Sequence, residues 1–197
     1  SMDEKICTIA LSRLKGIKAF EKKETLQHYE YIAPLFKGTR KHHNQRIHEK
    51  ITSFKDWKTI ERELSLLETM AVHIITIKDN NYPELLRNIP DAPIVLYTKG
   101  PLCVGKNTLA IVGSRRATFE GINLAEKIAQ TLSSLGITVV SGLARGIDSA
   151  AHRGAMKEKG KSVAVLGCGI DICYPPENKT LFENIGKQGM IITEYRP

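Results

Sequence analysis

The first seventy residues follow a helical pattern of apolar and polar positions. Ile6, Ile9 and Leu14 recur at the spacing of one helix face, and this run ends at Gly16. The same spacing predicts three further helices, over residues 22–35, 47–54 and 57–70. Residues 3–70 are therefore expected to form a small all-helical N-terminal domain.

After residue 70 the pattern changes to short apolar strands. A β-branched run over 72–77 predicts a strand, and an extended segment follows at 94–97. The strands expected beyond residue 108 are 109–112, 137–140, 162–166 and 190–193, and the helices expected between them are 121–135, 148–159 and 177–187. Unbroken apolar strands that alternate with helices are typical of a parallel sheet covered on both faces and joined by right-handed connections. Residues 71–197 are therefore expected to form a doubly wound parallel α/β domain.

The composition fits a globular protein and excludes several other classes. Of the 197 residues, 42% are hydrophobic and 25% are charged, which argues against wholesale disorder. No stretch approaches the roughly 18 apolar residues of a membrane-spanning helix. The start of the chain has no apolar region before a cleavage site, and Ser1 before Met2 resembles a remnant of tag removal. We expect a cytoplasmic protein without a membrane partner.

The cysteines do not indicate a metal or redox site. Cys7, Cys103, Cys168 and Cys173 are scattered, and none forms a C-x2-C pair. Cys168 and Cys173 are expected to pack as small apolar side chains. No metal and no cofactor are therefore predicted.

The positive charge is concentrated in the first third of the chain. The formal net charge is +8, and residues 1–60 hold 13 Lys and Arg against 7 Asp and Glu. Residues 61–197 hold 16 against 14. This excess fits a polyanionic partner or a solvated basic surface, and charge alone leaves both interpretations open.

Three glycine-containing loops follow expected strands. They are 113–118, 141–148 and 167–178. Parallel sheets bind ligands at the carboxyl ends of their strands, and amide groups at a following helix start attract anions. Arg115 and Arg116 are suited to bidentate contacts with phosphate. The loops therefore predict a phosphate-binding rim.

The same loops lack the motifs of nucleotide enzymes. The first loop has arginine where G-x-G-x-x-G needs glycine, and no Walker loop is present. No nucleophile with a base at motif spacing stands out, and Glu194 is a lone candidate acid. We therefore expect no catalytic residues and no nucleoside-hydrolase or ATPase activity.

Simple structural roles compete with functional ones for four residues near these loops. Asp148 is interpreted as the N-cap of the helix that follows, and His152 as a structural residue of that helix. Arg145 alone is a solvated charge, and Tyr174 before two prolines anchors its loop.

A set of motifs in this region resembles a known family. They are Ile111–Arg116, Val140–Asp148 with Ala151 and His152, Ala164–Asp171 and Tyr174–Asn178, preceded by lead-in segments Tyr82–Leu86 and Pro93–Gly100. In this order and spacing, from about Tyr82 to Tyr195, they resemble the DprA/Smf family of DNA-processing proteins.

The resemblance implies a fold, a partner and a site. The family core is an extended Rossmann-like fold that binds single-stranded DNA and is not known as a hydrolase. The implied role is to protect incoming DNA and deliver it to a RecA-type recombinase during natural transformation, as a homodimer. The implied phosphate-binding residues are Gly113, Ser114, Arg115, Arg116, Thr118, Ser141, Gly142, Arg145 and Gly146.

The chain departs from the family pattern at both ends. The resemblance implies that residues 3–70 form the SAM or helix-hairpin-helix domain that often precedes the family core, but the segment 14–18 has only one of the two hairpin glycines. The family core continues past Tyr195, so residues 71–197 are expected to be incomplete at their C-terminal end.

Two other classes of function remain open at this point. The related lysine-decarboxylase-like phosphoribohydrolases are nucleotide-binding enzymes with a similar fold, but their Pro-Gly-Gly-x-Gly-Thr motif is absent here. The other open class is a protein without enzymatic activity that binds a partner through its helical N-terminal region.

Overall fold

The computed structural model describes residues 3–101, 104, 107–157 and 160–197. The chain divides into two compact units, Ser1–Leu96 and Tyr97–Pro197. The strand and short helix that precede Leu96 therefore group with the N-terminal helices. The domain division at residues 70 and 71 stays a prediction.

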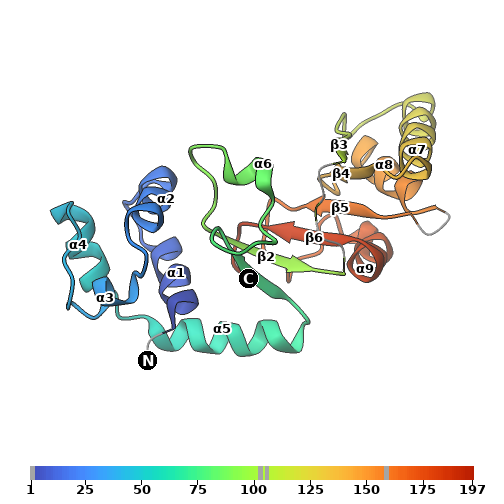
Figure 1. Ribbon diagram of the computed structural model, residues 1–197. Coiled ribbons are helices and arrows are strands. Elements are labelled where there is room, and N and C mark those ends of the chain that lie inside the picture. Colours follow the sequence, from blue (N-terminus) through green and yellow to red (C-terminus); the bar gives the residue numbers. More distant parts are fainter. Residues whose placement is uncertain (1–2, 102–103, 105–106, 158–159) are drawn as a thin grey trace. The chain divides into compact units, whose positions relative to one another are not determined.

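The first unit begins with a run of helices (Figure 1). They are α1 (Glu4–Arg13), α2 (Ala19–His28), α3 (Ala33–Phe36), α4 (Gln45–Thr52) and α5 (Trp57–Thr69). This confirms the helical N-terminal region. The prediction of a single helix over 22–35 is wrong, because the chain forms two helices there, α2 and α3, and leaves the helical conformation between them. Pro34 lies in the first turn of α3, where a missing N–H is tolerated, and the Glu4 carboxylate accepts from Ile32 N–H and Ala33 N–H at 2.9 and 2.8 Å.

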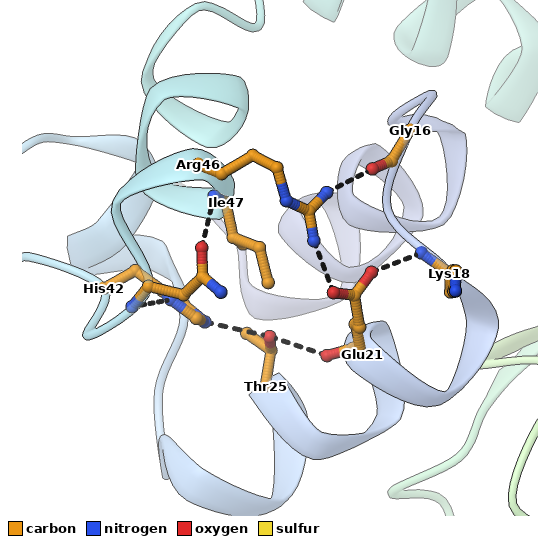
Figure 2. A network of polar contacts seen from close by, with 8 residues as sticks. Gly16, Lys18, Glu21, Thr25, His42, Arg46 and Ile47 are labelled. Atoms are coloured by element: carbon orange, nitrogen blue, oxygen red, sulfur yellow. Dashed lines mark hydrogen bonds and ion pairs between the residues drawn. The ribbon is translucent and has the colours of Figure 1, made fainter.

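A polar network joins the start of α2 to α4, as Figure 2 shows. The Glu21 carboxylate accepts from the Lys18 backbone N–H at 2.8 Å and pairs with Arg46, which also donates to the Gly16 carbonyl. The hydrogen bond from Lys18 and the charge of Arg46 lower the pKa of Glu21. Arg46 is thereby engaged in holding the two helices together.

His42 extends this network along α2 through Thr25 (Figure 2). Its Nε2 lies 3.0 Å from Thr25 Oγ1, and its Nδ1 accepts from Asn44 N–H at 3.0 Å. Asn44 in turn accepts from Ile47 N–H at 3.2 Å and caps α4. His42 is buried, so this polar cluster is part of the core of the helical region.

Six strands form one sheet within the described residues. They are β1 (His73–Thr76), β2 (Val95–Lys99), β3 (Thr108–Ala110), β4 (Thr138–Ser141), β5 (Ser162–Val165) and β6 (Met190–Thr193). Their order is β1-β2-β6-β5-β4-β3. The neighbours from β3 to β6 are all parallel, which confirms the α/β class and the parallel pairing expected from residue 108 onward.

Strand β2, expected from the sequence only as an extended segment at 94–97, does not share the direction of the parallel strands. It runs antiparallel to β6, with Tyr97 opposite Thr193. The chain enters β2 from the lead-in, which contains only the short helix α6 (Glu84–Arg87), and not through a covering crossover helix. The crossover rule that orients parallel strands therefore does not apply to β2.

The crossover helices lie on one face of the sheet (Figure 1). They are α7 (Phe119–Ser134), α8 (Ile147–Ala155) and α9 (Lys179–Gln188), the last preceded by the 3-10 turn η2 (Pro176–Asn178). Helix α7 packs against α8, and α8 packs against α9. Because β3 to β6 are adjacent in chain order, right-handed connections place all three helices on the same side.

The expectation that helices cover both faces of the sheet is therefore not met in the described chain. On the other face, Val112 is 72% exposed and Val165 is 48% exposed, whereas Val163, two residues before Val165 in β5, is buried. The covered face holds the fully buried Val139 together with Ala129 and Ala151.

Small residues allow α7 and α8 to pack closely. A Cβ on Gly154 would lie 2.1 Å from the Glu126 carbonyl oxygen, so this contact requires glycine. Helix α8 ends at Ala155, and the expected end at Lys159 lies outside the described residues, as does Cys103.

Candidate functional site

The loops that follow β3, β4 and β5 lie at one edge of the sheet. We call them the β3 loop (113–118), the β4 loop (142–146) and the β5 loop (166–175). Their strands are parallel neighbours, so their carboxyl ends share an edge. Ser141 Oγ donates to the Ile111 carbonyl at 2.6 Å, and Ile147 N–H donates to the Ser114 carbonyl at 3.2 Å. The prediction that the loops share one rim is confirmed.

A single buried carboxylate joins the first two loops. Asp148 Oδ1 accepts from Gly113 N–H at 3.3 Å, and Asp148 Oδ2 accepts from Gly142 N–H at 3.1 Å. The interpretation of Asp148 as an N-cap is wrong, because α8 begins at Ile147 and its N-cap is Gly146. Asp148 instead sits in the first turn of α8, where the helix dipole favours a negative charge.

This arrangement changes which groups are available to an anion. Gly113 and Gly142 are among the phosphate-binding residues that the resemblance implies, but the amide groups of both already donate to Asp148. At the start of α7, Thr118 Oγ1 accepts from Gly121 N–H at 3.1 Å and caps the helix. The side chains of the β3 loop remain available to a ligand.

Arg115 and Arg116 are the most accessible of these groups. Both are exposed, and neither forms an ion pair within the part of the chain that the structure describes. Ser114 is also exposed, and its Oγ accepts from Arg116 N–H at 3.1 Å, which stabilises the turn that carries the arginines. The β3 loop therefore presents two free cations on an ordered backbone.

Close contact between the β3 and β4 loops depends on Gly146. Its φ is +78°, and an added Cβ would lie 2.2 Å from the Ser114 carbonyl oxygen. A side chain at this position would push the β3 loop away from the start of α8. Gly146 thus supports the site through its backbone.

Arg145 is engaged within the protein. Its guanidinium pairs with Glu177, and its centre lies 5.6 Å from the centre of the Tyr174 ring. The hydrogen bond to Glu177 raises the pKa of Arg145, and the same contact lowers the pKa of Glu177. The interpretation of Arg145 as a solvated lone charge is wrong, because the guanidinium joins the β4 loop to the end of the β5 loop.

Two buried polar side chains hold the backbone of the β4 loop in place through hydrogen bonds. His152 Nε2 accepts from Leu143 N–H at 3.2 Å, and Asn178 Nδ2 donates to the Leu143 carbonyl at 3.0 Å. Leu143 itself has a φ of +58°, which is unusual for a branched residue. The structural interpretation of His152 is confirmed. The part played by Asn178 was missed, because the sequence placed it in the first turn of the helix expected over 177–187.

The thiols near the site are shifted toward their protonated form. Burial raises the pKa of both Cys168 and Cys173. No group of His, Cys, Asp and Glu suited to a metal ion occurs among the described residues. Within the same residues, no helix is both long and apolar enough to cross a membrane.

The comparison with family models gives one match across the second half of the chain. The model described as DNA recombination-mediator protein A matches residues 73–197. This range includes every candidate site residue.

Two relatives illustrate the similarity to whole sequences. The protein Smf of Synechocystis is 35% identical over 198 residues, which cover 95% of this chain and 50% of the relative. The DNA processing protein DprA of Streptococcus pneumoniae is 43% identical over 123 residues, which cover 62% of this chain and 43% of the relative. The chain thus spans about half or less of the length of these curated relatives.

Two solved structures resemble the fold. The X-ray structure of DprA from Streptococcus pneumoniae has a TM-score of 0.73 at 30% identity, covering 98% of this chain and 68% of that one. A structure of DprA from Helicobacter pylori, described for its single-stranded DNA binding mode, has a TM-score of 0.57 at 26% identity. It covers 64% of this chain and 56% of that one.

Proposed function

The chain belongs to the family of DNA recombination-mediator protein A, and on this premise we propose that its sheet-edge loops bind single-stranded DNA through the phosphate backbone. The observation that carries the proposal is the pair of exposed arginines, Arg115 and Arg116, on a loop whose backbone is tied down by Asp148 and Ile147. Arginine binds phosphate oxygens bidentately, and an ordered loop loses little entropy on binding.

The charge distribution supports this location. The unit Tyr97–Pro197 holds 13 Lys and Arg against 8 Asp and Glu, whereas Ser1–Leu96 holds 16 against 13. Several cations of the first unit are engaged in structural contacts: Arg13 with Glu63, Lys22 with the Ser12 carbonyl, Lys23 with the Arg87 carbonyl and Arg46 with Glu21. The basic excess of residues 1–60 is thus in part structural.

We further propose the biological role that the family suggests. In this role the protein acts in DNA processing during natural transformation, in the cytoplasm. There it protects incoming single strands and helps to load a RecA-type recombinase, as a homodimer. The protein is proposed to bind DNA without turning over a substrate. His152, the one histidine of residues 97–197, is fully buried with both ring nitrogens hydrogen-bonded, so it does not suit acid–base catalysis.

The decisive variant removes both arginines of the β3 loop. Arg115→Ala combined with Arg116→Ala is expected to weaken binding of oligo(dT), because two phosphate contacts are lost. The slope of log affinity against log salt should fall by about 0.7 for each contact. The loss should be nearly uniform across base sequences, since phosphates carry no base identity. Both side chains are exposed, so stability should change by no more than about 0.5 kcal/mol.

The matched control removes two exposed lysines from the opposite edge of the sheet. Lys161 precedes β5 and Lys187 lies in the last turn of α9, just before β6. Lys161→Ala combined with Lys187→Ala lowers the net charge equally but should leave the salt slope nearly unchanged. Equal effects of the two double variants on oligo(dT) affinity would show that the affinity depends on the net charge of the protein and not on the β3 loop. If the Arg115 and Arg116 double variant instead has a lower melting temperature and an unaltered salt slope, the two arginines stabilise the fold and do not contact phosphate.

A further inference from the structure

The exposed aromatic side chains of the second unit gather at the edge that carries the arginines. In the described part of Tyr97–Pro197 these are Phe119, Tyr174 and Tyr195, which are 75%, 56% and 49% exposed. Phe119 opens α7 after the β3 loop, Tyr174 lies in the β5 loop, and Tyr195 follows β6. All three positions follow the carboxyl end of a parallel strand, whereas the amino edge has no exposed aromatic residue among the described positions.

Tyr174 is the best positioned of the three. Its ring lies beside the Arg145 guanidinium, 5.6 Å from ring centre to guanidinium centre, and Arg145 is itself paired with Glu177. The segment that follows is anchored because Asn178 Nδ2 donates to Ser149 Oγ at 2.8 Å and to the Leu143 carbonyl at 3.0 Å. More than half of this large side chain remains exposed although its surroundings are ordered.

We propose that a base of the bound single strand stacks on the Tyr174 ring while Arg115 and Arg116 hold neighbouring phosphates. This inference rests on the proposed function and assigns the part of the strand that each residue contacts. Bases have π faces that stack on aromatic side chains, and a cation beside the ring adds to the attraction. In a duplex these faces are already stacked, so a platform of this kind favours single strands.

The experiment compares two ligands of the same length and charge, oligo(dT) and an oligonucleotide of abasic deoxyribose phosphates. The full chain and its Tyr174→Ala variant are measured with both. Loss of one stacked base is expected to weaken oligo(dT) binding by about 5- to 150-fold. Binding of the abasic strand should be unchanged, because it has no base to stack. Tyr174→Phe keeps the ring and should bind oligo(dT) like the parent.

The outcomes separate this inference from the proposed function. Equal oligo(dT) affinity of Tyr174→Ala and the parent would overturn the inference. An equal loss on both ligands would also overturn it, since the tyrosine would then act by positioning the Arg145 charge. If the Arg115 and Arg116 double variant still weakens both ligands, the proposed function stands in either case. If the parent binds neither ligand, the proposed function fails and the stacking role fails with it. A thermal melt of Tyr174→Ala verifies that the variant is folded.

Discussion

Acidification from pH 6.5 to about 4 is expected to lower the free energy of unfolding by about 3 kcal/mol through His152 alone. Burial lowers the pKa of His152 from 6.5 to about 4. The folded state therefore binds this proton later than the unfolded chain does. Stability is unaffected above pH 6.5 and falls by about 1.4 kcal/mol per pH unit as the pH drops toward 4.

The hydrogen bonds of His152 explain why its charged form is excluded. Nε2 accepts from Leu143 N–H, so the proton of the neutral ring is on Nδ1, which lies 2.8 Å from Ser162 Oγ. Ser162 donates onward to the Val139 carbonyl at 2.8 Å. A second proton on Nε2 would face the Leu143 N–H and break the contact that holds the β4 loop.

Denaturant titrations of the full chain from pH 7 to pH 4 measure this effect. The matched variant is His152→Gln, which has a different absolute stability but no titrating ring. The free energy of unfolding of this variant should fall less over this range than that of the parent. The difference between the two losses should be about the loss attributed to His152. Burial also lowers the pKa of His42, so some loss with the same sign remains in the variant. Parallel curves for the two proteins would contradict the prediction.

Asp148→Ala is expected to lower the free energy of unfolding by about 1–3 kcal/mol. The substitution leaves the partly buried amide groups of Gly113 and Gly142 without their acceptor, and an unsatisfied donor that water reaches costs less than a fully buried one. It should also weaken oligo(dT) binding, because the loop that carries Arg115 and Arg116 loses its attachment to α8. The measurements are the denaturant midpoint and the oligo(dT) affinity of the same preparation.

Asp148→Asn provides the control for shape and volume. The amide side chain keeps one acceptor oxygen, so its cost should fall between those of the parent and the alanine variant. If Asp148→Ala retains the parent's midpoint and affinity, Asp148 does not organise the loops.

Much of the second unit could be predicted from local sequence, because apolar runs separated by helices specify parallel neighbours. The shared edge of the β3 and β4 loops follows from that pairing. The roles of Asp148 and Asn178 could not be predicted, because they depend on contacts between residues 35 positions apart in the sequence. The antiparallel direction of β2 and the placement of the crossover helices on one face depend on strand order, which the pattern of apolar residues does not encode.

Arg145 is a candidate site residue whose contacts could not be predicted from the sequence. The resemblance assigned it to phosphate binding together with the other cations, but Glu177 and Tyr174 already contact its guanidinium. Sequence identifies which cations follow the strands, whereas only the folded chain distinguishes Arg115 and Arg116 from a cation with internal partners.

We propose that the strand-end loops receive single-stranded DNA, and not the segment 37–43 of the first unit, whose cations are Lys37, Arg40 and Lys41. The test follows the backbone amide signals of the full chain by NMR during titration with oligo(dT). We predict that the largest shifts occur at Ser114, Arg115 and Arg116, with smaller shifts at Gly113 and Gly142, whose amides stay bound to Asp148. Shifts confined to residues 37–43, with the β3 loop unchanged, would contradict the account.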